Sequence, residues 1–556
     1  PAVTPDLKTP SAAALGIPYR RQETLVYPRS FPDAYFKAPE NIYREKNNSL
    51  TMRDVNEEIY LYILPKAWRP LAILGLCLVI TWVLRKNLEF LNLSSYQQLY
   101  SARLTRAYLG ATNPRRLDTD EGKRISDPIP GDDCPMSDYG PHHAGGPLHI
   151  INVTINETIN GKSQIEQRDR KGLPMAIGPV TLTVGVPYTA LIAFEERREG
   201  APHLAPKPPE KLLITPFRAA DAGDETQQPA ESVSYHVFGA PGTRLAENLR
   251  LSNWVGISGA AFSTGAGAHT TLSLSILTGL ANVRLGYWWD SGVHWRDRAK
   301  TGATRGKLGD LSEEFPLLAH LADEVTGQFR GPSRRDWYLS DGGHFENTGC
   351  YELLRRRLPL MIVCDCGADP DYQFEDIGNL VRKARVDFDT EIEFLEDEKL
   401  LGFLQMFGPL DQTPNDPFRT RVLETFGGLK ALYRTESTGK GIPGGKYSKA
   451  HACLAKVRYA VSSPSPPGVV DWYHSLLLVI KPSLTGDEPV DLLQYHSQNP
   501  DFPQEPTSDQ FFDEAQWESY RRLGVEIATA LFDRTHLIER LLDAVADQRT
   551  ETPPPE

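Results

Sequence analysis

The sequence is poor in cysteine, with six residues among 556. Cys364 and Cys366 form the one close pair, so the dense spacing of a disulfide-stabilised scaffold is absent and a reducing compartment is expected. Their spacing places both thiols on one face of a strand, where we expect buried structural residues. An excess of positive charge is also absent. The 60 Lys and Arg against 72 Asp and Glu give a net charge of −12, which argues against a nucleic-acid partner.

Sequence motifs for metals and nucleotides are absent as well. No HExxH occurs, the glycine-rich stretch 439–448 does not satisfy GxxxxGK[ST], and no second Cys/His pair has the spacing of a zinc site. Cys134 precedes three histidines at irregular spacing in an expected loop: His142, His143 and His149. We therefore expect neither a metal nor another cofactor.

A secretory leader is not evident at the start of the chain. The first residue is Pro, and the first forty residues are rich in Pro, Arg and Tyr instead of a basic region followed by an apolar one. From this we expect the chain to begin partway into a longer architecture. Its 556 residues, 40% of them apolar and 24% charged, still suffice for a large globular core.

Long apolar runs are scarce, and one stands out. Fifteen uncharged residues, Pro70 to Leu84, lie between Arg69 and Arg85. As a helix they measure about 22 Å, against roughly 30 Å of bilayer hydrocarbon. Flanking basic residues and tryptophans favour a membrane-associated helix over 65–86, and a buried core helix is the alternative. Basic residues flank both ends about equally, so the orientation is not readable.

The remaining chain divides by composition and periodicity. A helical segment and an acidic linker are expected after the apolar helix, followed by alternating short apolar runs and helical stretches that indicate an α/β fold with a mainly buried sheet. The expected regions are a loop-rich arm (1–64), the apolar helix (65–86), the helical segment and linker (87–146), an α/β region (147–400), a variable insertion (401–450), C-terminal strands with an amphipathic helix (451–545) and a disordered tail (546–556).

Individual elements are predicted from the same patterns. The expected strands are 148–155, 181–186, 253–257, 337–340, 358–365, 456–461 and 475–484. The expected helices are 260–280, 351–357 and one that begins near residue 509.

The first candidate for chemistry is Gly256-Ile257-Ser258-Gly259-Ala260. If 253–257 is a strand and 260–280 a helix, Ser258 lies on the tight turn between them, where a nucleophilic serine has helix N-terminal amides beside its hydroxyl. Gly256 and Gly259 would be the small residues that permit this elbow. The pattern departs from GxSxG at its fifth position, and close packing of a helix on a strand is the alternative for Ser258.

The second candidate is the run from Ser340 to Asn347, SDGGHFEN, directly after an expected strand. Asp341 stands at the carboxyl end of that strand, and Gly342 and Gly343 let the backbone turn sharply. A partly desolvated aspartate at such a place is suited to act as general base for a serine hydroxyl. An Asp-Gly turn that caps the next helix is the alternative.

The stretch YLSDGGHFENTGCYELLRRRLPLMIVCDCGADP, Tyr338 to Pro370, resembles bacterial patatin-like phospholipases, especially the large membrane-associated members related to cytosolic phospholipases. Further segments resemble the same family in the same order: RLTRAYLGAT, PLHIINVTIN, GISGAAFSTGAG, NVRLGYWW, FEDIGNLVRKARVDF and FPQEPTSDQFFDEAQWESYRRLG. The resemblance covers roughly 87–400 and 450–530. It implies a three-layer α/β domain, and it places Asp341 in the DG[GA] motif as the base of a Ser–Asp dyad.

The same resemblance implies an acyl-enzyme mechanism without a cofactor. It also implies a phospholipid or other acyl-ester substrate, a membrane location and a catalytic region on the cytoplasmic side; an oligomeric state is not implied. The family's oxyanion loop, GGGxR[GA], is missing, because the upstream pair Gly145-Gly146 lies about 110 residues before Ser258 and precedes Pro147. The nucleophile is therefore either Ser258 or a residue before Pro1. In the second case the chain is a catalytically incomplete portion or a membrane-docked interaction module. A soluble binding protein with a core helix over 70–84 is a third hypothesis.

Overall fold

The structure is a computed structural model. It describes residues 64–85, 87–118, 127–159, 170–186, 188–193, 211–217, 244–292, 314–396, 399–400, 426–436, 441–442, 445–460, 472–506, 509 and 512–533. The chain forms two compact units, Pro1–Thr81 and Trp82–Glu556. The arm expected over 1–64 and the tail expected over 546–556 lie almost wholly outside the described residues, as does more than half of the insertion expected over 401–450.

The described part of the first unit belongs to helix α2 (Leu64–Leu84), which confirms the helix expected over 65–86. Its apolar side chains are exposed, with Leu71 at 62%, Ile73 at 63% and Leu78 at 61%, whereas the core-helix alternative requires burial. Within the part of the chain that the structure describes, no helix has the length and apolar composition to cross a membrane.

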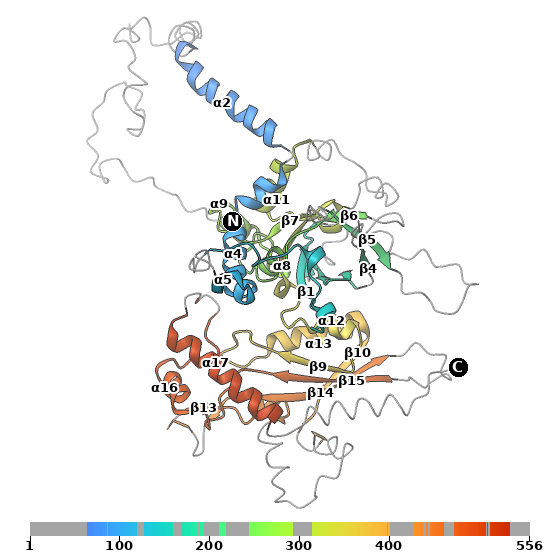
Figure 1. Ribbon diagram of the computed structural model, residues 1–556, viewed down its shortest axis with the longest axis vertical. Helices are drawn as coiled ribbons and strands as arrows, with labels where there is room; N and C mark the ends of the chain where they lie inside the picture. Colours follow the sequence, from blue (N-terminus) through green and yellow to red (C-terminus); the bar gives the residue numbers. More distant parts are fainter. Residues whose placement is uncertain are drawn as a thin grey trace, which may run out of the picture. The chain divides into compact units, whose positions relative to one another are not determined.

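The second unit contains an eight-stranded antiparallel sheet in the order β6-β5-β4-β3-β2-β1-β8-β7 (Figure 1). Its strands are β1 (Ile151–Asn156), β2 (Gly172–Ile177), β3 (Thr181–Val184), β4 (Tyr188–Ala193), β5 (Lys211–Phe217), β6 (Arg244–Glu247), β7 (Tyr287–Asp290) and β8 (Asp336–Asp341). β1 lies between β2 and β8, so its residues are flanked by backbone on both sides.

Helices cover both faces of this sheet near β7 and β8. On one face, helix α8 (Leu251–Ser258) packs Trp254 and Ile257 against Val153, Leu339 and other apolar side chains of the strands. On the other face, helices α3 (Leu88–Leu93) and α11 (Pro316–Thr326) contact the neighbouring strand residues. Side chains of a strand alternate between faces, which is why consecutive residues of β7 and β8 belong to the two separate clusters.

A second, five-stranded sheet has the order β10-β14-β15-β9, with β11 paired beside β14. Its strands are β9 (Leu360–Cys364), β10 (Thr390–Phe394), β11 (Phe426–Gly427), β14 (Ala452–Ala460) and β15 (Trp472–Ile480); β12 (Thr435–Glu436) and β13 (Lys446–Tyr447) form a separate pair. Helices α12 (Cys350–Arg355) and α13 (Glu375–Phe388) pack on one face, while α16 (Val490–Gln498) and α17 (Glu514–Ala528) pack on the other. This part is a helix–sheet–helix sandwich (Figure 1).

Polar contacts join the two sheets within the second unit. Arg170, just before β2, forms a bidentate ion pair with Asp387 of α13, at 2.7 and 2.9 Å. The hydroxyl of Tyr351 donates to the same carboxylate at 2.8 Å. The Arg355 guanidinium donates to the carbonyls of Gly185 and Val186 after β3. These contacts fix α12 and α13 against the eight-stranded sheet.

The mixture of helices and sheets is confirmed, and most predicted elements are present. The strands expected near 148–155, 181–186, 337–340, 358–365, 456–461 and 475–484 are β1, β3, β8, β9, β14 and β15, and the helices expected over 351–357 and from 509 are α12 and α17. The strand expected over 253–257 is wrong, because these residues belong to α8. The single helix expected over 260–280 is also wrong: a loop and a short 3-10 turn precede α9 (Leu272–Leu280).

Candidate active site

Asp341 is the last residue of β8, and the pairing of β8 with β1 places it beside Val153. Because side chains alternate along a strand, Asp341 shares its face with Leu339, which packs in the cluster under α8. The carboxylate therefore lies on the side of the sheet that α8 covers, at the end where β1 begins.

The turn after Asp341 is a single 3-10 turn, Gly342–His344. The Asp341 carboxylate caps it by accepting a 2.7 Å hydrogen bond from the Gly343 amide. Burial is the main influence on this carboxyl and outweighs that hydrogen bond, so the pKa of Asp341 rises to about 6. An aspartate with such a pKa is largely ionised at neutral pH and remains basic enough to take a proton.

The first glycine of the turn lies close to backbone, and the second lies close to a side chain. A Cβ on Gly342 would lie 2.6 Å from the carbonyl oxygen of Asn152, and one on Gly343 would lie 2.5 Å from Oδ1 of Asn347. Asn347 in turn donates to Asp376 of α13 at 2.8 Å. The Asp341 turn is thus held between β1 and α13.

Ser258 is the last residue of α8, and Gly259 is the C-cap. The predicted strand-to-helix elbow is therefore wrong. The apolar residues Leu251, Trp254 and Ile257 recur at helical spacing and pack together on the sheet, so the helical period prevails over the strand expected from the short apolar run. Gly256 lies inside α8, where a Cβ would collide with Ser101 of α4 (Gln97–Ala107).

The surroundings of Ser258 are those of a helix C-terminus. Its hydroxyl donates a 2.7 Å hydrogen bond to the carbonyl of Asn152. The amides of the next three residues are bonded to nearby carbonyls: Gly259 to Val255, Ala260 to Ile257 and Ala261 to Gly259. The carbonyl end of a helix disfavours a developing alkoxide. These three amides do not form an oxyanion hole in the observed arrangement.

The structure nevertheless brings the two sequence motifs together. Ser258 bonds to the Asn152 carbonyl, and a Cβ on Gly342 would meet that same oxygen. His344 of the Asp341 turn contacts the loop after Ser258, with Nε2 at 3.2 Å from the carbonyl oxygen of Ala261. Ser258 and the turn after Asp341 thus both lie against the carbonyl of Asn152 in β1.

His344 is one of the residues whose role sequence reasoning missed. Its Nδ1 lies 2.9 Å from the hydroxyl oxygen of Ser340, and Asn156 donates to that hydroxyl at 2.8 Å. Burial lowers the pKa of His344 to about 4. The neutral ring accordingly accepts from Ser340 at Nδ1 and donates to Ala261 at Nε2. The spacing of Ser340 and His344 within SDGGH was the available signal.

Tyr100 of α4 is the other missed residue. Burial raises the pKa of its phenol, and the nearby Asp341 charge raises it further. A Cβ on Gly259 would lie 2.5 Å from the Tyr100 hydroxyl oxygen. Gly259 therefore serves to admit this phenol beside the end of α8. No local sequence pattern predicts this contact, because Tyr100 and Gly259 lie far apart in the chain.

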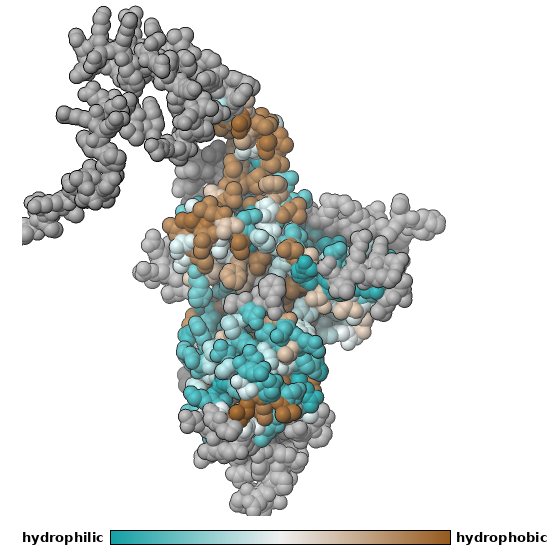
Figure 2. Space-filling model, turned by 90° about the vertical axis from the view of Figure 1, so that its left-hand side faces the viewer, coloured by the Kyte–Doolittle hydropathy of each residue, from teal (hydrophilic) through white to brown (hydrophobic). Residues whose placement is uncertain are grey.

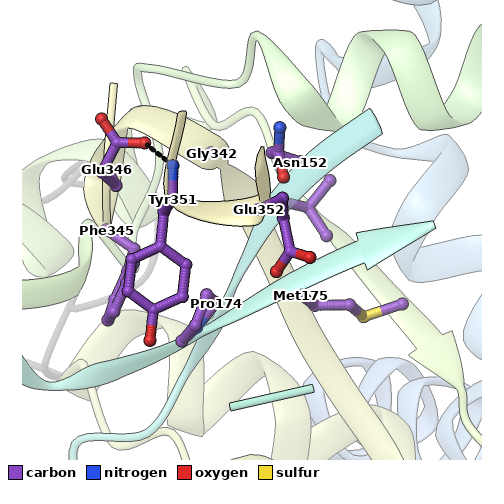
Figure 3. A pocket seen from close by; sticks show the side chains of 9 residues that line it. Asn152, Pro174, Met175, Gly342, Phe345, Glu346, Tyr351 and Glu352 are labelled. Carbon is purple, nitrogen blue, oxygen red and sulfur yellow. Dashed lines mark hydrogen bonds between the residues drawn. The ribbon is translucent and has the colours of Figure 1, made fainter. Parts of the chain in front are cut away.

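A small hollow lies next to the Asp341 turn. Its walls include Asn152, Met175, Gly342 and two acidic residues, Glu346 and Glu352 (Figure 3). It has room for about one water molecule. Glu346 accepts hydrogen bonds from Thr348 and from the Tyr351 amide, and burial raises the pKa of this carboxyl. The hollow does not form the groove that an acyl chain requires.

The cysteine and histidine candidates give no metal centre. Cys364 ends β9 and Cys366 lies beyond it, and both are exposed, so the expected burial is wrong and Asp365 is the buried residue between them. Among the residues that the structure describes, no three His, Cys, Asp or Glu side chains are grouped to hold a metal ion. His149 instead lies within hydrogen-bonding distance of Tyr139, at 2.8 Å.

Comparison of the chain with protein-family models, with the curated proteins and with the solved structures gave no match. The functional assignment therefore depends on the geometry around Asp341.

Proposed function

We propose that this protein belongs to the patatin-like serine acyl hydrolases and cleaves phospholipids or other acyl esters at a membrane surface, with Asp341 as general base. The carrying observation is the Asp341 carboxyl itself, which is held at the end of β8 by a two-glycine turn and has its pKa raised to about 6 by burial. The five-stranded sheet with helices on both faces supports the three-layer architecture of this family. The exposed apolar side chains of α2 support the membrane location.

The chemistry requires one proton acceptor and one nucleophile. Asp341 takes the proton of a serine hydroxyl while the serine oxygen bonds to the ester carbonyl carbon. The alcohol leaves with the proton returned by Asp341, which completes an acyl-enzyme. Water then attacks the acyl carbon and gives its proton to Asp341, and the fatty acid departs as the serine recovers its hydrogen.

Ser258 is the candidate nucleophile in this chain. It lies on the Asp341 side of β1, and α8 contacts both β8 and the Asp341 turn. To react, its hydroxyl must leave the Asn152 carbonyl, and amides other than the three bonded ones after it must stabilise the oxyanion. Each missing oxyanion donor costs on the order of 10²–10³ in rate.

Those bonded amides favour a second candidate function. In it the chain provides the base and the membrane contacts, and it acts as a catalytically incomplete module that has neither its own oxyanion loop nor its nucleophile. This alternative explains why the Ser258 hydroxyl is satisfied by a backbone carbonyl at a helix C-terminus.

Hydrolysis of short-chain nitrophenyl esters by the full chain tests the base. Asp341→Asn should lower kcat by on the order of 10²–10⁴, while Asp371→Asn, which changes an exposed carboxylate, should leave it unchanged. Equal rates in the wild type and Asp341→Asn would refute the assignment. A fluorophosphonate probe tests the nucleophile: labelling that is lost in Ser258→Ala supports Ser258, and absence of labelling in the wild type supports the incomplete module.

A further inference from the structure

Helix α9 (Leu272–Leu280) has its polar side chains inside and its apolar side chains outside. Ser275 and Thr278 are its buried residues. Leu272, Leu277 and Leu280 are 59%, 67% and 74% exposed. A helix on a water-facing surface has the reverse pattern, so the exposed leucines call for an apolar neighbour.

The buried hydroxyl groups of α9 are hydrogen-bonded. The Ser275 hydroxyl donates to the carbonyl of Thr264 at 2.7 Å, and the Thr278 hydroxyl donates to that of Leu274 at 2.8 Å. A Cβ on Gly279 would lie 3.1 Å from a methyl carbon of Val325, so the glycine allows close approach of α11. Small residues between helices and large apolar residues outside are typical of helices that face lipid.

The apolar surface extends beyond α9 to its neighbours. Asn282, just after α9, donates to the Ser94 carbonyl after α3 at 2.9 Å, and the Leu285 amide donates to the Phe262 carbonyl at 2.7 Å. The lipophilic face, as we call it, comprises these exposed residues: Phe90, Leu93, Phe262, Leu272, Leu277, Leu280, Val283 and Leu318. Apolar side chains gather on this side in Figure 2. Monomeric soluble proteins rarely expose an apolar patch of more than a few hundred Å².

The distribution of charge indicates the headgroups. Residues 251–283 contain no Asp, Glu, Lys or Arg, while 82–118, at the start of the second unit, contain six Lys and Arg against two Asp and Glu in a chain of net charge −12. On α4 and the residue before it, the exposed Tyr96, Leu99 and Arg103 follow one another at helical spacing. An uncharged segment together with exposed basic and aromatic side chains on α4 matches an anionic bilayer surface.

We propose that the lipophilic face inserts into the interfacial layer of an anionic lipid bilayer. The nine residues of α9 span about 14 Å, so the helix lies in the plane of the interface. This proposal rests on the proposed function in one respect: the bound lipid surface also supplies the substrate. Lipid binding is a separate property, measurable without hydrolysis.

Flotation of the full chain with vesicles tests the proposal. The vesicles contain phosphatidylcholine alone or with 30 mol% phosphatidylglycerol. Leu277→Asp with Leu280→Asp should weaken binding to the anionic vesicles by on the order of tenfold or more. The matched controls Val386→Asp and Val490→Asp, at 73% and 82% exposed residues, should bind as the wild type does.

A variant of α2, Leu74→Asp with Leu78→Asp, separates the contribution of that helix. With α2 altered, the chain should still float with anionic vesicles and should lose flotation when Leu277 and Leu280 are also changed. Arg103→Gln should weaken binding to the anionic vesicles by about fivefold and leave the weaker binding to neutral vesicles unaltered. Urea denaturation of each variant verifies that the exposed substitutions preserve folding.

Equal flotation of the wild type and the Leu277/Leu280 variant would overturn the proposal. So would a wild-type dimer, measured by light scattering, that the same variant converts to a monomer without a change in lipid binding, because a second copy would then cover the face. Asp341→Asn should float as the wild type does. Normal flotation with no hydrolysis by the wild type would contradict the proposed function and leave the lipid-binding face supported.

Discussion

Nδ1 of His344 accepts a hydrogen bond from the Ser340 hydroxyl across 2.9 Å. His344 lies three residues after Asp341, and burial shifts the pKa values of these two groups in opposite directions. Burial raises the pKa of Asp341 to about 6 and lowers the pKa of His344 to about 4. Each group is thus driven toward its neutral form. As the pH rises from 4 to 6, Asp341 therefore lowers the free energy of unfolding, whereas His344 raises it.

Asp341→Asn should stabilise the protein at neutral pH. The native carboxyl holds its proton up to a higher pH than the unfolded one, so the wild type loses stability as the pH rises from about 4 to about 6. The substitution removes that loss and should raise the free energy of unfolding by about 2 to 3 kcal/mol at pH 7. Below about pH 3, where the carboxyl is protonated in both states, the gain should vanish. Urea denaturation at several pH values measures it, and a variant less stable than the wild type at pH 7 would contradict the assigned burial.

His344→Gln should show the reverse dependence. Below pH 6.5 the histidine is protonated in the unfolded state, whereas native His344 is protonated only near pH 4. The wild type therefore loses stability on acidification. The glutamine does not titrate. Relative to the wild type, the variant should therefore gain stability as the pH falls from 6.5 to 4. The same urea series provides the comparison, and a difference that does not vary with pH would show that His344 titrates normally.

Gly256→Ala tests the contact of α8 with α4. The new Cβ would meet the Ser101 hydroxyl and lie 2.8 Å from Nε2 of Gln97, so we expect a loss of roughly 1 to 3 kcal/mol from overpacking. Gly524→Ala is the matched control in α17, where nothing lies within 4 Å of the added atom. That change should stabilise by about 0.5 to 1 kcal/mol. Thermal unfolding of both variants would refute the packing if they shifted in the same direction.

Lys481→Met tests a buried ion pair at the ends of β9 and β15. The ammonium lies 3.1 Å from Asp365 and 3.7 Å from Asp369, and both Lys481 and Asp365 are buried. Removing the cation leaves a buried carboxylate without its partner, which should cost roughly 3 to 5 kcal/mol. Adding Asp365→Asn should recover part of the loss.

The matched control for this pair is Lys399→Met. Lys399 forms an ion pair with Glu393 in which the lysine is 64% exposed, so its loss should change stability by less than about 1 kcal/mol. Equal losses from the two lysine substitutions, measured by urea denaturation, would show that burial does not set the strength of the Lys481 pair.

The local periodicity of the sequence predicts six of the strands that the structure describes, the helices α2, α12 and α17, and the helical segment that follows α2. Apolar alternation marks β1, and continuous apolar runs mark β8 and β9. It fails at 253–257, since a five-residue apolar run fits a strand and a buried helix equally well. The separation into two sheets is beyond the reach of local patterns, because β1 pairs with β8 across nearly two hundred residues.

The candidate site was predicted unevenly for a similar reason. Asp341 follows a strong strand and precedes two glycines, and these local features locate its turn correctly. The predicted elbow at Ser258 required residues 253–257 to form a strand. Because these residues form a helix, Ser258 lies at a helix C-terminus instead. Tyr100 approaches Gly259 only through the packing of α4 on α8, which no spacing in the sequence encodes.

The uncharged stretch between Arg250 and Arg284 also has a practical consequence for mapping. Trypsin cleaves after Lys and Arg, so digestion releases Leu251 to Arg284 as one peptide that contains both Ser258 and α9. A photoreactive lipid that attaches to α9 and a fluorophosphonate that attaches to Ser258 would therefore appear as two mass additions on the same fragment.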